Sequence, residues 1–228
     1  MSLDLIIDIE TDGLLPDVSK IHCIGMSVVE AQAGQVFSNQ EPYDCLDDAL
    51  EIMSSAKSIT GHNIIGYDLP VLKKILGWTP SKSTQIIDTL VLSRLCHTNL
   101  YEIDVKERSI NNKLYGSHSL KAWGQRIGVL KKTLGAQDDE VWHKFTPAMA
   151  DYCVQDVSVT AHLKYHFDGG QKYLSLRNMA LFLAKIPMTI NNMMRSQSFN
   201  PKKPPILTKH KNKKRIEQFM PNKRNGLL

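Results

Sequence analysis

The amino-terminal segment constrains the fold most, because an apolar, β-branched run ends on two acids. Leu3 to Ile9 has the composition of a buried strand, and Asp8 and Glu10 lie two residues apart at its end. Side chains at that spacing point to one face of a strand. Neighbouring carboxylates repel unless divalent cations lie between them, and oxygen ligands favour a hard cation. We therefore expect bound Mg²⁺ or Mn²⁺ here.

Two further acidic motifs follow in the chain. Asp68 lies where the apolar periodicity of a helix begins, after a short strand-like stretch. Thr146 and Pro147 are a suitable N-cap and first residue for a long helix that carries Tyr152 and Asp156. These last two residues are four apart and therefore project from the same helix face. Each motif alone is common, but the ordered set predicts a two-metal nuclease site.

The ordered motifs resemble those of the DEDDy subclass of DnaQ-like 3′→5′ exonucleases. Asp8 and Glu10 match the first family motif, Asp68 the second, and Tyr152 with Asp156 the third. The chain looks most like the proofreading domain of family-A polymerases from short-tailed lytic phages. The likeness spans about residues 3 to 167 and includes residues 87–95, 97–100, 116–124 and 154–157.

This resemblance implies a role for each acid. Asp8 would bridge two ions of Mg²⁺ or Mn²⁺, and Asp68 would act mainly through water on the second ion. Glu10 and Asp156 would complete the site of the nucleophilic water, which Tyr152 would orient or help to deprotonate. The expected metal ligands are thus Asp8, Glu10, Asp68 and Asp156, and Tyr152 completes the catalytic set.

Several nearby residues have two interpretations. Thr11, His62 and Asn63 are the expected substrate contacts, since Thr11 follows the first motif and the other two precede Asp68 in a loop. The remaining candidates have structural explanations that we favour over direct roles. These are a turn for Asp12, packing for Tyr67, a helix N-cap for Asp88 and a core position for Trp123.

The alternation of strand and helix patterns predicts an α/β fold, and the resemblance implies a ribonuclease H-like fold with a mixed central sheet flanked by helices. Strands are expected near residues 3–9, 22–29, 35–38, 58–60 and 85–87. Helices are expected near residues 44–55, 69–77, 89–96, 119–127 and 147–167. The polar segment Tyr101 to Tyr115 is predicted to be an exposed loop that could approach DNA.

Charge divides the chain into two unlike parts. Residues 177–228 hold 12 Lys and Arg and 1 acid, a net of +11, whereas residues 1–176 hold 16 basic and 22 acidic side chains, a net of −6. We expect an exonuclease domain at 1–170, a helical extension at 171–195 and a basic, disordered tail at 196–228. Nucleic-acid backbone would contact the tail through Lys209, Lys211, Lys213, Lys214 and Arg215. A solvated tail without a specific task is the alternative.

Composition excludes several classes of protein. The four cysteines form no CxxC pair, which argues against a disulfide framework or a zinc knuckle. No apolar run approaches the length of a membrane span, and no signal peptide is expected. We therefore expect a cytoplasmic protein with no membrane association, in the host-cell cytoplasm if a phage encodes it.

The expected function is metal-dependent 3′→5′ hydrolysis of DNA from single-stranded 3′ ends. An exoribonuclease of the same fold and a non-catalytic nucleic-acid-binding module remain open as alternatives. The residues after the exonuclease region are too few for a polymerase domain, so the chain could also be half of a split family-A polymerase. That hypothesis predicts co-purification with a separate polymerase chain, and isolation of the protein alone under native conditions would count against it.

Overall fold

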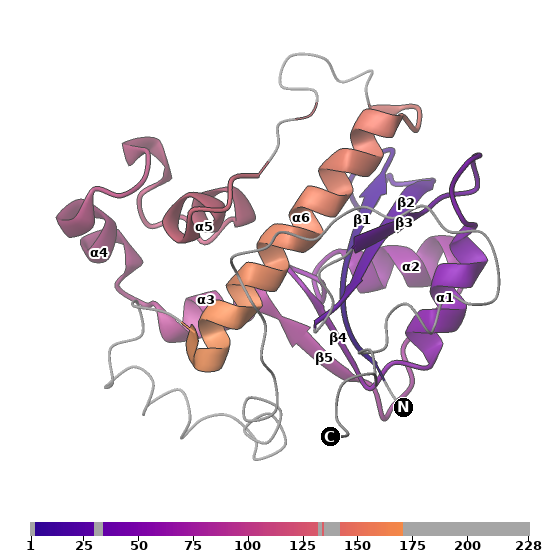
Figure 1. The fold of residues 1–228 in the computed structure, drawn as a ribbon, viewed down its shortest axis with the longest axis horizontal. Coiled ribbons are helices and arrows are strands. Elements are labelled where there is room, and N and C mark those ends of the chain that lie inside the picture. Colours follow the sequence, from indigo (N-terminus) through magenta and orange to yellow (C-terminus); the bar gives the residue numbers. More distant parts are fainter. Residues whose placement is uncertain (1–2, 30–33, 132–133, 135–141, 171–228) are drawn as a thin grey trace, which may run out of the picture.

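A computed structural model describes residues 3–29, 34–131, 134 and 142–170. Its centre is a five-stranded sheet in the order β3-β2-β1-β4-β5 (Figure 1). The first three strands pair in antiparallel fashion, whereas β1, β4 and β5 run parallel. The predicted mixed sheet flanked by helices is therefore confirmed. The expected extension at 171–195 and the tail at 196–228 lie outside the described residues.

The local patterns located most elements to within two residues of their observed ends. The strands are β1 Asp4–Thr11, β2 Ile21–Val28, β3 Gly34–Phe37, β4 Ser58–Gly61 and β5 Gln85–Asp88. The helices are α1 Leu46–Ser54, α2 Asp68–Leu76, α3 Thr89–Cys96, α4 Leu100–Glu107, η1 Asn112–Leu114, α5 Leu120–Ile127, α6 Pro147–Tyr165 and η3 His166–Gly170. As predicted, the Thr146 side chain caps α6, accepting from the Met149 N–H.

The two faces of β1 are covered by different helices. Leu5 and Ile7 belong to the core cluster that includes residues of α1 and α2. Ile6 instead clusters with Val157 and Ala161 of α6, which crosses the opposite face of the sheet (Figure 1). Because side chains alternate along a strand, Asp8 and Glu10 lie on the same face as Ile6. The alternation of β1 thus turns both acids toward α6.

A glycine permits α6 to approach the sheet closely. Gly25 of β2 pairs with Asp8 of β1. A Cβ at position 25 would lie 2.8 Å from Cys153 Sγ and 3.3 Å from the Cys153 carbonyl oxygen, closer than side chains tolerate. The missing side chain therefore allows the middle of α6 to pack beside the acids of β1.

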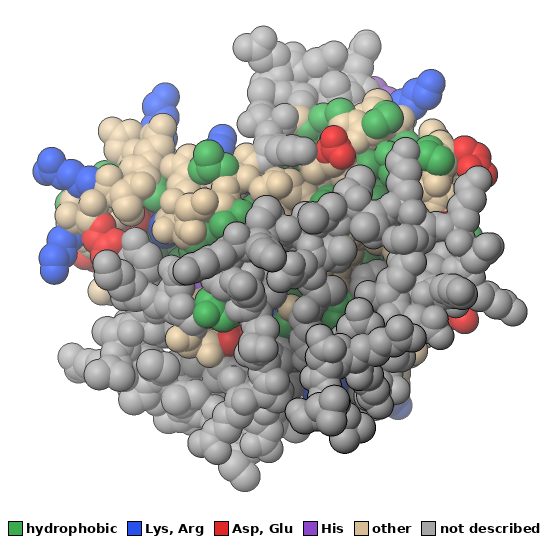
Figure 2. All heavy atoms as spheres, in the orientation of Figure 1, with side chains coloured by type: hydrophobic (Ala, Val, Ile, Leu, Met, Phe, Trp, Pro, Cys, Tyr) green, Lys and Arg blue, Asp and Glu red, His purple; other side chains and the backbone are tan. Residues whose placement is uncertain are grey.

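The prediction of a loop over Tyr101 to Tyr115 is wrong. Most of the first half of this segment forms α4, and η1 follows in the second half. Figure 2 shows Lys and Arg side chains around the lobe that α4 and α5 form at the left of Figure 1. The polar residues that indicated a loop are largely the solvated face of this short helix.

An ion pair buried inside the lobe explains why α4 forms. The Asp104 carboxylate accepts from Arg126 Nε at 2.9 Å and Nη2 at 2.8 Å, and both side chains are 1% exposed. Asp104 also accepts the Gly116 N–H at 2.8 Å. These contacts bind α4 to α5 and to the turn between them. The partner of Asp104 lies 22 residues away, so no local pattern reveals the pairing.

A cluster of aromatic rings fills the space where α6 meets α3 and α5. Trp123 is fully buried, as predicted, and His97 and His166 pack against it with centroid separations of 5.1 and 5.3 Å. The two histidine Nε2 atoms lie 3.4 Å apart. Burial lowers the pKa of each histidine to about 4, and the charge of His166 also disfavours protonation of His97. Both rings are therefore neutral at pH 7.

These histidines make a pH-dependent contribution to stability. Below pH 6.5 the unfolded chain takes up protons that the folded chain resists until about pH 4, so acidification through this window favours unfolding. We expect His97→Phe to reduce the loss of unfolding free energy between pH 7 and 4.5 by about 2 kcal/mol. Urea titrations of both proteins at the two pH values measure the difference. An equal loss of unfolding free energy in the wild type and in His97→Phe would contradict the prediction.

Among the described residues, no helix combines the length and the apolar character needed to cross a membrane.

Candidate active site

Carboxylates from three elements converge beside the end of β1. Asp8 and Glu10 come from the strand, Asp68 is the first residue of α2, and Asp156 lies on α6. The Asp68 carboxylate accepts the Ile9 N–H, which connects the start of α2 to the strand. Asp68 and Asp156 both add to the negative potential at Asp8. The fold thus brings together all four acids that the sequence singled out.

One potential metal-binding group lies within this convergence. A carboxylate oxygen of Asp8, one of Glu10 and the Sγ atom of Cys153 all lie within 4.8 Å of one another. Cys153 Sγ is 3.9 Å from Asp8 Oδ2 and 3.5 Å from the Asp8 carbonyl oxygen. The cluster therefore combines hard carboxylate oxygens with one buried thiol. Carboxylate oxygens suit Mg²⁺ or Mn²⁺ better than they suit a soft ion.

Charge repulsion and burial make the acidic cluster unfavourable by itself. Burial, followed by repulsion from Asp156 and Asp68, raises the pKa of Asp8 well above its usual value. Burial also raises the pKa of Glu10, and Asp8 and Asp156 add to the effect. The pKa of Asp68 rises to about 7, mainly through burial. A bound divalent cation would relieve the repulsion and let these acids ionise.

Asp156 has two unequal oxygens. Lys131 Nζ forms an ion pair with Oδ2, and the Lys131 side chain is 22% exposed while that of Asp156 is 3% exposed. Oδ1 is buried and makes no hydrogen bond in the structure. A buried carboxylate oxygen without a partner is unfavourable unless a proton donor or a cation contacts it. This oxygen is the observation that best fits the cluster to a metal ion.

Tyr152 lies about one helical turn before Asp156 on α6. The Lys131 ammonium lies 4.6 Å from the centroid of the Tyr152 ring. Burial and the negative charge of Asp156 raise the pKa of Tyr152 to about 12. The phenol is thus a neutral hydrogen-bond donor at physiological pH, held at the edge of the carboxylate cluster.

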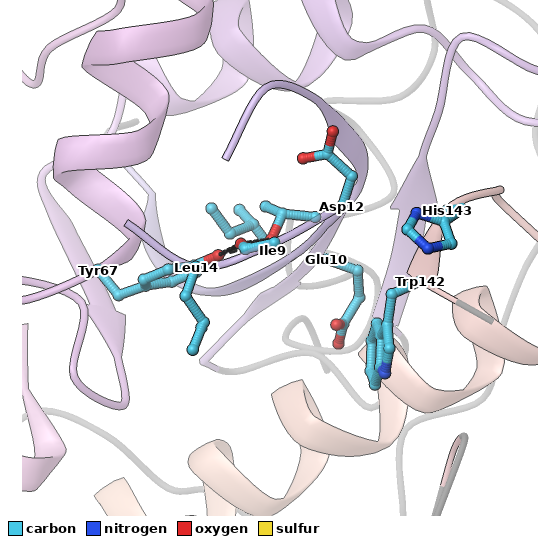
Figure 3. A pocket seen from close by; sticks show the side chains of 9 residues that line it. Ile9, Glu10, Asp12, Leu14, Tyr67, Trp142 and His143 are labelled. Carbon is cyan, nitrogen blue, oxygen red and sulfur yellow. Dashed lines mark hydrogen bonds between the residues drawn. The ribbon is translucent and has the colours of Figure 1, made fainter. Parts of the chain in front are cut away.

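A cavity of about 500 Å³ adjoins Glu10. Its lining is Ile9, Glu10, Thr11, Asp12, Gly13, Leu14, Tyr67, Trp142 and His143. In Figure 3 the Glu10 carboxylate lies between Leu14 and Tyr67 on one side and Trp142 on the other. Leu14, which lines this cavity, is 75% exposed. The walls are mainly apolar. Glu10 and Asp12 are the two acids in the lining.

The far wall of this cavity is tied to the sheet. The Trp142 carbonyl oxygen lies 2.7 Å from Nε2 of His22 on β2. The Trp142 ring contacts the Tyr152 ring edge to face, with centroids 6.0 Å apart. The strand and α6 therefore hold the segment before α6 at the mouth of the cavity.

Asp88 organises the loop that precedes Asp68. Its carboxylate accepts the N–H groups of Asn63 and Ile65 at 3.0 and 3.1 Å, and it also caps α3 as predicted. His62 Nδ1 lies 2.9 Å from Thr89 Oγ1, and burial lowers the pKa of His62 to about 4. Asn63 has a positive φ of 65°. This loop is thus held by fixed contacts at its start.

The predicted substrate contacts occupy different places. Thr11 lines the cavity, and its hydroxyl lies 2.6 Å from the Tyr67 hydroxyl. His62 and Asn63 lie in the neighbouring loop and are not among the lining residues. Tyr67 packs on the main core cluster, as predicted, but it also lines the cavity. Asp12 accepts the N–H groups of Ser19 and Lys20 at 2.9 Å, and these bonds hold together the two ends of the loop that follows β1.

Sequence reasoning missed three residues that the structure brings to the site. Lys131 follows α5 and offered no motif, and Trp142 stands in a segment without periodicity. Cys153 was visible inside the third motif, next to Tyr152. Its position on the helix was a usable signal. Cys153 lies about 100° around the helix axis from Tyr152, so its side chain can face the sheet.

Comparison with known proteins identifies the family. The model of the RNase H superfamily matches residues 5–167, and the chain belongs to this family. Relatives within it include the DNA-directed DNA polymerases of Escherichia phage T7, 35% identical over 181 residues, and of Enterobacteria phage T3, 35% identical over 183 residues. The likeness to phage polymerases predicted from the motifs is therefore confirmed. Each match covers 70% of this chain but 26% of the relative, so the chain spans about a quarter of the relatives' length.

Solved structures support the same fold. Brucella melitensis NrnC superimposes with a TM-score of 0.51 at 20% identity, over 88% of this chain and 91% of that chain. A nuclease in its apo form gives a TM-score of 0.51 at 19% identity, over 86% of this chain and 89% of the other. At this level of identity the likeness establishes the fold alone, and that fold is one used by nucleases.

Proposed function

We propose that the protein is a metal-dependent 3′→5′ exonuclease that hydrolyses DNA from single-stranded ends. The observation that carries the proposal is the meeting of four carboxylates from β1, α2 and α6, one of which keeps a buried oxygen without a partner. The likeness to phage DNA polymerases supports DNA as the substrate.

Each residue of the set has a task that its position permits. Asp8, Glu10, Asp68 and Asp156 would hold two divalent cations, which lower the pKa of a bound water and neutralise charge on the leaving 3′ oxygen. The neutral phenol of Tyr152, at the edge of the cluster, could hold the attacking water in line with the phosphorus atom. The water would give up a proton to solvent as it forms the new phosphorus–oxygen bond, and the bond to the 3′ oxygen would break as that oxygen takes up a proton from solvent. The products are a nucleoside 5′-monophosphate and a strand shorter by one nucleotide.

The cavity beside Glu10 would receive the terminal nucleotide. Its walls include Trp142, whose ring could stack on a base, and Leu14, whose side chain could pack against a base or a sugar. Leu14 is 75% exposed, so its side chain is accessible for such contact. Thr11 lines the cavity, whereas His62 and Asn63 would reach the next nucleotide from the loop before α2.

The direct test uses a 5′-labelled single-stranded DNA and an RNA strand of the same sequence. We expect a ladder that shortens the DNA from its 3′ end with Mg²⁺ or Mn²⁺, and no products with EDTA. Faster degradation of the RNA strand would instead favour the exoribonuclease alternative. Binding of both strands without cleavage under any metal condition would favour a non-catalytic module. Partnership with a separate polymerase chain stays a prediction, tested by co-purification under native conditions.

The basic segment from 196 to 228 is proposed to hold the acidic domain on its anionic substrate. Deletion of these residues removes Lys209, Lys211, Lys213, Lys214 and Arg215 together with their neighbours. We expect weaker DNA binding and a shallower dependence of affinity on salt, because fewer counterions are released. Fluorescence anisotropy at several salt concentrations measures the slope. The same slope in the full and shortened chains would refute the role, with hydrolysis of a saturating substrate as the control for folding.

A further inference from the structure

Lys131 stands out among residues with no assigned role, because the structure holds it against the acidic cluster. It lies beyond α5, whose left-handed C-cap is Gly128. Gln155 of α6 donates to the Leu130 carbonyl oxygen at 2.8 Å, which fixes the backbone beside Lys131. The side chain then reaches Asp156 with its ammonium group. Residues of α6 thus position both the backbone and the charge of Lys131.

Its contacts are those of a counter-ion to the acidic cluster. Among the ion pairs of the described residues, the Lys131–Asp156 pair is the one that reaches the four carboxylates. The ammonium takes Asp156 Oδ2 and lies 4.6 Å from the Tyr152 ring centroid, while Oδ1 stays without a partner. A single positive charge therefore offsets part of the charge of four acids.

A divalent cation and this ammonium group would lie on the two oxygens of one carboxylate. Oδ1 of Asp156 has no partner and is open to an ion, but the Lys131 ammonium on Oδ2 would repel a divalent cation bound there. Lys131 is also the more exposed partner, so it can withdraw toward solvent without disturbing α6. A lysine side chain has a flexible stem that permits this movement.

We propose that Lys131 is an internal counter-ion that competes electrostatically with divalent metal at Asp156, so that metal binding favours opening of the ion pair. The inference rests on the proposed function in one respect, namely that the four acids bind divalent cations. It goes further by assigning to Lys131 control over the affinity for that metal. The lysine stabilises the metal-free fold and lowers the affinity for metal at the same time.

The test measures binding of Mn²⁺ to the full, EDTA-stripped protein by the loss of the electron paramagnetic resonance signal of free Mn²⁺. Lys131→Met keeps most of the side-chain volume and removes the charge, whereas Lys131→Arg keeps the charge. We expect the methionine variant to bind Mn²⁺ at least about tenfold more tightly, and the arginine variant to stay near the wild-type affinity. The melting temperature of Lys131→Met should fall below that of wild type in EDTA and recover with Mn²⁺.

Lys164→Met is the matched control, because Lys164 forms a 2.6 Å ion pair with Asp168 and is 5% exposed. It should leave the affinity for Mn²⁺ unchanged. Equal or weaker binding by Lys131→Met would overturn the inference. Failure of the proposed function gives a different result, in which the wild type and Asp8→Asn bind Mn²⁺ equally or neither the wild type nor Lys131→Met binds it. Binding by Lys131→Met alone would support the competition.

Discussion

Replacing Asp8 with asparagine is expected to lower exonuclease activity about a thousandfold or more. Asparagine keeps the shape of the side chain but supplies one neutral oxygen, so it cannot hold a cation at the centre of the cluster. The negative charges of Asp156 and Asp68 both raise the pKa of Asp8, so Asp8 lies close to the acids of α6 and α2. Release of labelled mononucleotide per minute at saturating Mg²⁺ measures the loss.

The same substitution should make the metal-free protein more stable. The raised pKa of Asp8, due first to burial and then to repulsion from Asp156, means that the folded state disfavours its ionised form. Stability is therefore lost as pH rises above the pKa of an unfolded aspartate, and asparagine removes that loss. We expect a higher melting temperature than wild type at pH 7 in EDTA.

Asp4→Asn is the matched control for Asp8. Asp4 lies on the same face of β1, at the opposite end, where it accepts the Ser58 hydroxyl at 2.6 Å. Its substitution should leave activity within about twofold of wild type, because surface-near polar changes have small effects. Retained activity in Asp8→Asn, or equal losses in both variants, would contradict the assignment of the site to this end of the strand.

The second large effect is expected at the buried ion pair of the α4–α5 lobe. Asp104→Ala leaves Arg126 without its partner in a position where both side chains are 1% exposed. Removal of one member of a buried pair typically costs about 3–5 kcal/mol, since the remaining charge is desolvated and uncompensated. For a chain of this size, that corresponds to a fall of roughly 10 °C in melting temperature.

Thermal unfolding followed by circular dichroism measures this loss. The control is Lys57→Ala, which breaks a 3.8 Å ion pair whose lysine is 50% exposed and should cost less than about 1 kcal/mol. A second variant, Asp104→Leu with Arg126→Met, replaces the pair with apolar side chains and should recover much of the stability. If Asp104→Ala melts like Lys57→Ala, the buried pair is not what holds α4 in place.

Elements with strong local periodicity were predictable. β1 carries Asp8 and Glu10 on one face because side chains alternate in any strand, and α6 carries Tyr152 and Asp156 on one face because helical residues four apart lie together. Neither relation depends on the rest of the molecule. The capping roles of Asp88 and Thr146 were predictable for the same reason, since a cap acts within three residues.

The helix α4 was missed because its stability comes from elsewhere in the chain. Half of its residues are charged, and its single buried acid, Asp104, resembles a loop residue until Arg126 is placed beside it. A segment of eight residues has little helical stability by itself, so tertiary contacts decide its conformation. Polar composition correctly indicated solvent exposure but not the conformation of the backbone.

The sequence by itself thus determined the family motifs, the strand face that carries two acids and the helix face that carries the third motif. Only the tertiary structure decided that Lys131 reaches Asp156 from 25 residues away, that Trp142 walls the cavity beside Glu10, and that Gly25 admits α6 to the sheet. The physical reason is the range of the interactions. Periodicity reports which face a side chain occupies, whereas the partner on the opposite surface is selected by packing and charge across the folded chain.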